Sequence, residues 1–298
     1  MLARGESFVD MPIDALVAKW EPALTEIGER VWMTRFIARY LNLQGSERLP
    51  RGLPEKVRPA QPARAVREGH IHAVEMIEDL AAFTETVNLY ERHLGAGNVY
   101  FRPTEKGLTV MSLDHEQCVS MIGVSGRDTG DEYLASIPPS AEQVAIAFAG
   151  YCKKRDSLQR RSEEERFSLR CIQHALANRL RLPDSDWYFI HQEWRFPSGM
   201  AVGKLDLLAV DPMQSQLVVI ELKDSEAKAL ARDGRGRTAE EQAEAYADLL
   251  VEHRAELYPF FERLARAMAV AYGGPDSMKE LELDLELRPT TAVWWPDR

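Results

Sequence analysis

Three charged side chains fall at the ends of two neighbouring apolar segments, and their spacing indicates a reactive site. Residues 203–211 and 217–223 are rich in aliphatic and β-branched residues, and a short polar turn joins them, so both are predicted strands. Alternate side chains of a strand share a face, which places Glu221 beside Lys223. Asp206 reaches the same place if the strands pair as a hairpin. Two carboxylates and an ammonium group would be costly to desolvate there without a further partner, such as a metal ion.

Hydrolysis of a phosphodiester is one reaction that such a set of groups could support. A divalent metal ion polarises the phosphoryl oxygen and lowers the pKa of a bound water. Mg²⁺ takes oxygen ligands and keeps several waters, so we expect Asp206, Glu221 and the carbonyl of Leu222 to bind Mg²⁺, with Mn²⁺ as a substitute. Lys223 would orient or activate the water and offset charge in the transition state. Taken alone, the Glu-x-Lys pair could instead be a surface ion pair worth under about 1 kcal/mol.

Four elements in order resemble the PD-(D/E)XK nuclease superfamily. The first acid matches Gly203-Lys-Leu-Asp206, and the Glu-x-Lys signature matches Glu221-Leu-Lys223. Residues Gln242-Ala-Glu-Ala-Tyr246 resemble the Gln-x-x-x-Tyr helix of the RecB-like branch. Upstream, three glutamates open a predicted helix where the family carries another acid. The resemblance covers roughly residues 160–298, with Leu205 in place of the proline of the superfamily's name.

The resemblance implies an α/β fold with a restriction-endonuclease-like core of a helix, a three-strand meander, a helix and a strand. It implies a magnesium-dependent nuclease, a hydrolase of phosphodiester bonds, with DNA as the expected substrate. Gln242 and Tyr246 share a helix face, where they would hold the active site and the substrate strand or merely close a helix-sheet contact. The alternative function is a catalytically silent module of this fold that binds nucleic acid or a protein. Lys223 favours the enzyme, because metal binding alone does not require it.

The upstream acid has three adjacent candidates, residues 163–165. Ser162 followed by Glu165 fits a capping box, in which Glu165 would be worth roughly 1 kcal/mol of stability and have no catalytic role. Glu165 also shares a helix face with Leu169, Ile172 and Leu176. This face is expected to turn towards the sheet, so we expect Glu165 to be a metal ligand and catalytic residue, with Glu164 in reserve.

Basic residues flank the predicted site and could contact nucleic-acid phosphates. The candidates are Arg160, Arg161, Arg232, Arg235 and Arg237. Glycines among the last three arginines indicate a mobile basic loop, and a solvated loop without function is an equal alternative. Residues 46–69 alternate proline with basic residues, which is typical of a solvated connector; a phosphate-binding arm is the alternative there.

A length of 298 residues suggests two domains or one large one, and a composition with 45% hydrophobic residues is typical of a globular protein. We expect a small α+β domain of unknown role over residues 1–156 and the nuclease-like domain over residues 157–298. A net charge of −10 argues against nucleic acid binding over the whole surface, although a local basic groove is compatible with it. A second copy of the chain or another protein is a further candidate partner. Three widely spaced cysteines and the absence of a signal peptide or membrane span predict a cytoplasmic protein.

Overall fold

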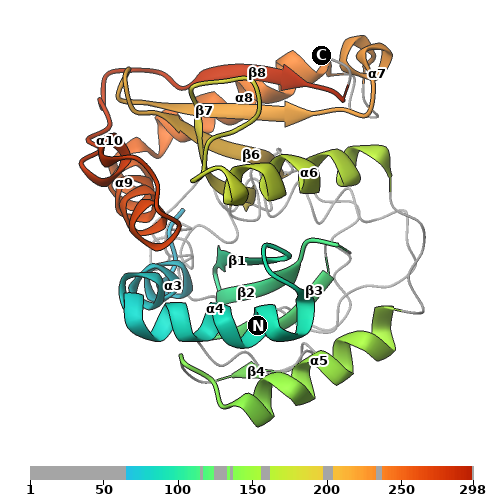
Figure 1. Ribbon diagram of the computed structural model, residues 1–298. Helices are drawn as coiled ribbons and strands as arrows, with labels where there is room; N and C mark the ends of the chain where they lie inside the picture. Colours follow the sequence, from blue (N-terminus) through green and yellow to red (C-terminus); the bar gives the residue numbers. More distant parts are fainter. Residues whose placement is uncertain are drawn as a thin grey trace, which may run out of the picture. The chain divides into compact units, whose positions relative to one another are not determined.

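The described part of this computed structural model has mixed α/β architecture with two four-stranded sheets (Figure 1). The structure describes residues 65–114, 117–123, 133–134, 137–155, 162–196, 204–232 and 237–296. The chain divides into two compact units, Met1–Ala63 and Arg64–Arg298, and every described residue belongs to the second unit. The coarse prediction of an α/β protein is therefore confirmed.

The first sheet, called sheet A below, has the strand order β1-β2-β3-β4. Its strands are β1 (Val99–Thr104), β2 (Gly107–Ser112), β3 (Gln117–Ile122) and β4 (Tyr133–Leu134). The first three form an antiparallel meander, and β4 pairs in parallel with β3. Gly107 makes the close turn between β1 and β2, because its φ is +115° and a Cβ there would lie 2.3 Å from the Ile122 carbonyl oxygen.

Three helices accompany sheet A: α3 (Glu68–Glu78), α4 (Leu80–Leu94) and α5 (Ala141–Arg155). Helices α3 and α4 follow each other directly and are divided at Asp79. The side chain of Asp79 accepts a hydrogen bond from the Ala82 amide at 3.2 Å and so caps the second helix. Gly95 ends that helix with a φ of 89°.

The second sheet, called sheet B, has the order β5-β6-β7-β8. Its strands are β5 (Tyr188–Arg195), β6 (Lys204–Asp211), β7 (Gln216–Leu222) and β8 (Thr290–Trp294). The first three are antiparallel, and β8 pairs in parallel with β7. The helices around it are α6 (Glu163–Ala177), α7 (Glu226–Leu230), α8 (Ala239–Glu252), α9 (Arg254–Ala271) and α10 (Asp276–Lys279).

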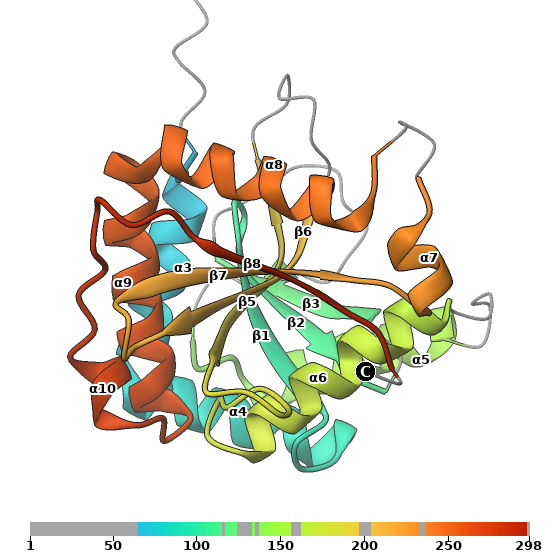
Figure 2. The ribbon, with the colours of Figure 1, turned by 90° about the horizontal axis from the view of Figure 1, so that it is seen from above.

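Helices α6 and α8 lie on opposite sides of sheet B (Figure 2). Each begins at a capping box, formed by Ser162 with Glu165 and by Thr238 with Glu241. Between the two helices, β7 is buried along its length except at Gln216, as expected for a strand covered on both faces. The chain therefore runs helix, three-strand meander, helix and strand, with the short α7 before α8 and with α9 and α10 before the last strand.

The predicted boundary near residue 156 separates sheet A from sheet B, while both sheets lie in one compact unit. Arg263 of α9 joins Glu78 of α3 through two hydrogen bonds of 2.8 and 2.6 Å. His191 of β5 meets Pro103 of β1. Within the part of the chain that the structure describes, no helix is long and apolar enough to cross a membrane.

Candidate active site

Asp206 and Glu221 come together where β6 and β7 separate. The ladder between these strands ends at the pair Leu207 and Ile220, and the two acids follow that pair directly. Oδ2 of Asp206 accepts a hydrogen bond of 2.9 Å from the main-chain amide of Leu222. Glu221 is 4% exposed, while Asp206 is partly buried. The hairpin thus brings the two predicted carboxylates to one face at one end of the sheet.

Lys223 satisfies only half of the Glu221 carboxylate. Its Nζ donates to Oε1 of Glu221 at 2.6 Å, and both side chains are largely buried, 14% and 5% exposed. Oε2 of Glu221 is buried and has no hydrogen-bond partner among the described residues. An acceptor of this kind is costly to bury alone, so the site lacks one cationic or donor partner for this oxygen.

The pKa values of Asp206 and Glu221 also reflect the lack of a positively charged partner. Burial, and then the neighbouring Asp206 carboxylate, raise the pKa of Glu221 to about 8. Burial raises the pKa of Asp206 to about 6, although the Leu222 amide and Lys223 act against it. Burial alone would lower the pKa of Lys223, but the neighbouring carboxylates, Glu221 first and then Glu164 and Asp206, together raise it. Two acids and one ammonium group leave an excess of negative charge when all three are ionised.

The upstream helix directs Glu164, rather than Glu165, towards this site. The charge of Glu164 raises the pKa of Asp206, of Glu221 and of Lys223. Glu165 is exposed, and its Oε2 accepts the Ser162 amide at 3.0 Å while its own amide donates to Ser162 Oγ at 3.1 Å. The capping alternative therefore describes Glu165, because a carboxylate that bends back to the N-cap does not reach the sheet.

The packing of α6 explains this choice. One turn after Glu164, buried Ser168 accepts a hydrogen bond from Gln192 Nε2 of β5 at 3.1 Å. Glu164 therefore continues the face that meets sheet B. The predicted stripe through Leu169 and Ile172 is also buried, and at the helix start, where the capping box competes with the periodic pattern, Glu165 turns back to Ser162.

Comparisons of the chain with protein-family models, with curated proteins and with solved structures found no match.

The donor set around Asp206 and Glu221 consists of oxygens. Among the described residues, no group of three or more His, Cys, Asp or Glu side chains is arranged to hold a metal ion. The predicted set that included Glu165 is thus not assembled, and two carboxylates and the Leu222 main chain remain. Mg²⁺ is commonly held by one or two carboxylates, with waters and substrate phosphates completing its shell. The residues present fit such an ion, and the unpartnered Glu221 oxygen is where it would bind.

The two residues of the Gln-x-x-x-Tyr segment lie on α8. The Tyr246 hydroxyl donates to the Lys204 carbonyl at 2.7 Å, and its ring stacks on Phe196 with centroids 6.2 Å apart. Gln242 lies one turn earlier and is partly buried. Tyr246 therefore holds the first residue of β6, two positions before Asp206.

Two of the five candidate phosphate-binding arginines fall within the described residues. Arg232 is exposed, and its Nη1 lies 3.6 Å from Oε2 of Glu241 at the start of α8. Arg237 is partly buried just before the same helix. Arg235, Arg160 and Arg161 lie outside the described residues.

Sequence reasoning missed an ion cluster next to Asp206. Arg102 of β1 and Lys204 of β6 both bind Glu193 of β5. Burial alone would raise the pKa of Glu193, but Lys204 and Arg102 together lower it. In the sequence, Glu193 is one polar residue of an alternating strand, and its partners are 91 and 11 residues away, so no local signal marks the cluster.

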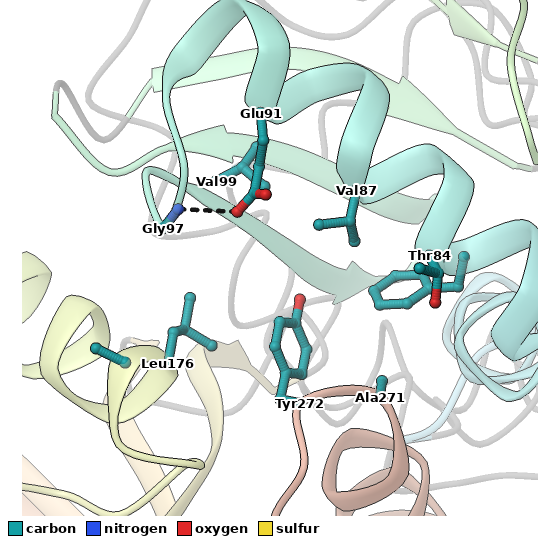
Figure 3. A pocket seen from close by; sticks show the side chains of 10 residues that line it. Thr84, Val87, Glu91, Gly97, Val99, Leu176, Ala271 and Tyr272 are labelled. Carbon is teal, nitrogen blue, oxygen red and sulfur yellow. Dashed lines mark hydrogen bonds between the residues drawn. The ribbon is translucent and has the colours of Figure 1, made fainter.

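A separate hollow of about 180 Å³ opens beside α4 (Figure 3). Its lining is mostly apolar and includes Val87, Val99, Leu176 and Tyr272. The carboxylate of Glu91 at its edge accepts the Gly97 amide at 2.8 Å (Figure 3). No residue of the candidate site lines this hollow.

Proposed function

We propose that this protein is a divalent-metal-dependent nuclease that hydrolyses phosphodiester bonds, with DNA as its substrate, on a core of the PD-(D/E)XK type. The observation that carries the proposal is the pair Asp206 and Glu221, which lie side by side with raised pKa values and leave one Glu221 oxygen unpartnered. Buried like charges persist in a fold where something compensates them, and a divalent cation does so with oxygen ligands. The order helix, meander, helix and strand around the pair supports the same proposal.

Asp206, Glu221 and the Leu222 carbonyl would hold Mg²⁺ or Mn²⁺. When bound, the ion would polarise a phosphoryl oxygen and lower the pKa of a water. Lys223 has a raised pKa and is therefore a cation at neutral pH. Its ammonium group can orient a water and stabilise negative charge that develops on the phosphate, but it is not the base that removes the proton.

The second candidate function is a silent module of the same fold that binds nucleic acid or a protein. It is favoured by the lack, among the described residues, of any metal-binding group of three His, Cys, Asp or Glu side chains. In that case Lys223 and Glu221 would be a structural ion pair. The unpartnered Glu221 oxygen argues against this, because a pair kept for stability gains from satisfying both oxygens.

The decisive experiment is a cleavage assay on single-stranded DNA, double-stranded DNA and RNA with Mg²⁺, Mn²⁺ or EDTA. We expect DNA cleavage that requires the metal and is lost in Glu221→Gln. Asp211→Asn is the matched control, because Asp211 ends the same β6 strand and its Oδ1 accepts turn amides at 3.0 and 3.1 Å, a role that asparagine can keep. Binding of DNA without cleavage under any metal condition would support the silent module instead.

A further inference from the structure

The edge strands of the two sheets, β1 and β5, meet beside the candidate site. The rings of Tyr100 and Phe189 lie 5.4 Å apart. Nε2 of buried His191 donates to the Pro103 carbonyl at 2.8 Å. Next along both strands, Arg102 Nη1 donates to Glu193 Oε2 at 2.7 Å. These contacts connect sheet A to the strand that pairs with β6, the strand carrying Asp206.

The ion cluster at this junction is mostly buried. The side chains of Arg102 and Glu193 are 16% and 15% exposed, and the second Glu193 oxygen accepts from the half-exposed Lys204 ammonium group. Nε of Arg102 is buried without a hydrogen-bond partner among the described residues. A buried ion pair contributes little net stability, so its presence beside the site points to a role other than stability.

The backbone at Glu193 is unusual in a way that matters for Asp206. Gln192 pairs with Leu207 and Trp194 pairs with Leu205, so Glu193 stands opposite Asp206. Its φ is +56°, which a residue with a side chain rarely adopts inside a strand. In a regular ladder, residues directly opposite share a face, and Glu193 would add a third carboxylate beside Asp206. Instead, Arg102 and Lys204 bind and neutralise that carboxylate.

We propose that Arg102 of sheet A is a positioning residue for the site on sheet B and acts through Glu193 and Lys204. Lys204 is held at its ammonium group by Glu193 and at its carbonyl by Tyr246. Together these contacts fix the start of β6 and therefore the position of the Asp206 carboxylate. The inference rests on the proposed nuclease function, and it assigns sheet A a part in the site.

The test uses the full chain with Arg102→Met and the matched control Arg263→Met. Arg263 also joins two helices of the unit, α9 and α3, through its pair with Glu78, but belongs to no element of the site. Loss of a residue that orients a metal ligand typically costs 10- to 100-fold in metal affinity or activity. We expect Arg102→Met to weaken Mn²⁺ binding, measured by calorimetry without DNA, and to lower kcat by about this factor while KM changes little. Arg263→Met should match the wild type in both.

A double-variant cycle separates positioning from general stability. Lys204→Met should fold, because its side chain is half-exposed, and should reproduce the loss in kcat and in Mn²⁺ affinity. If Arg102 and Lys204 both act through Glu193, the loss of kcat and Mn²⁺ affinity in the double variant is no larger than in the more impaired of the two single variants. Arg102→Lys keeps the charge and should restore part of the activity. If Arg102→Met does not fold, Lys204→Met and Glu193→Gln provide the same measurements.

The outcomes distinguish the inference from the function on which it rests. A wild type without metal-dependent cleavage overturns the proposed function and the inference with it. A wild type that cleaves, with Arg102→Met and Lys204→Met equal to it in kcat and Mn²⁺ affinity, overturns the inference alone. Losses that multiply in the double variant and follow the fall in Tm would make Arg102 a structural residue, which also overturns the inference.

Discussion

Sheet A and sheet B have the same strand plan, but among the described residues the one fully buried acidic side chain, Glu221, lies in sheet B. Each is a three-strand antiparallel meander with a fourth strand added in parallel. In sheet A, two buried serine hydroxyls have partners: Tyr90 pairs with Ser120, and Tyr151 donates to Ser112 at 3.0 Å, although the Tyr100 hydroxyl and Arg102 Nε are buried without a partner among the described residues. In sheet B, Glu221 is buried with one oxygen unpartnered. Strand topology alone thus does not indicate a site. The indication comes from the carboxylate of Glu221, which is buried at the end of sheet B.

The largest expected effect comes from removing a charge from sheet B. Asp206→Asn or Glu221→Gln should lower the cleavage rate about 10³-fold, because a metal contributes several kcal/mol of transition-state stabilisation. The Tm of Asp206→Asn should equal or exceed that of the wild type, since it relieves repulsion between buried like charges, whereas Glu221→Gln also removes the charged partner of Lys223 and should gain less stability. Ser120→Ala in sheet A should do the reverse, losing about 1–3 kcal/mol of stability while cleavage persists. Equal cleavage by all three variants would remove the distinction between the sheets.

The pH dependence of stability should come from sheet B as well. The raised pKa values mean that the folded protein keeps protons on Asp206 and Glu221 that the unfolded chain releases at ordinary values of 3.8 and 4.5. This contribution to stability is complete below about pH 4 and is lost as pH rises through about 6 and then about 8. Each group can change the free energy of unfolding by up to about 1.4 kcal/mol per pH unit.

Chemical denaturation between pH 4 and 9, with EDTA present, measures this dependence. Glu221→Gln should show a smaller loss of stability with pH than the wild type, and the difference between the two curves isolates the pair from other titrating groups. Parallel curves would mean that Glu221 does not titrate in this window.

Two neighbouring glutamates on α6, Glu164 and Glu165, should differ in their effect on cleavage, by a smaller factor than the variants above. Glu164→Gln should weaken Mn²⁺ binding and slow cleavage about tenfold, because its charge acts on Asp206 and Glu221. Glu165→Gln should leave cleavage and Tm nearly unchanged, since glutamine can also serve in a capping box. Calorimetry and initial rates on both variants decide the matter. Lost cleavage in Glu165→Gln at an unchanged Tm would restore Glu165 as the upstream acid.

The smallest expected effect concerns the arginines before α8. Arg232→Ala should weaken DNA binding and reduce the slope of log affinity against log salt by about one for a single lost phosphate contact. Arg237→Ala should behave similarly. Arg181→Ala serves as a control, because its guanidinium group is committed to Asp186 and the Ser185 carbonyl in the turn before β5. An unchanged slope in both variants would place the phosphate contacts elsewhere.

Local pattern predicted the parts of the fold that local chemistry controls. Alternation and a polar turn identified the β6–β7 hairpin and put Glu221 and Lys223 on one face, where they now form an ion pair. The cap at Ser162 identified the start of α6. Helix α9 was not anticipated, and its buried rings Phe260 and Phe261 pack on Trp194 of β5, a partner more than sixty residues away.

The sequence by itself identified the candidate site: the acids Asp206 and Glu221, the lysine beside them and the strands that carry them. Side-chain alternation and capping depend on residues a few positions apart, so they can be predicted from the sequence without knowledge of the fold. Only the tertiary structure decided that the charge of Glu164 acts on Glu221. It also decided that Arg102 binds Glu193, which lies 91 positions later in the chain. Those outcomes depend on how α6 packs against sheet B and on where β1 meets β5. Contacts between residues far apart in the sequence decide both, so the spacing of neighbouring residues does not predict them.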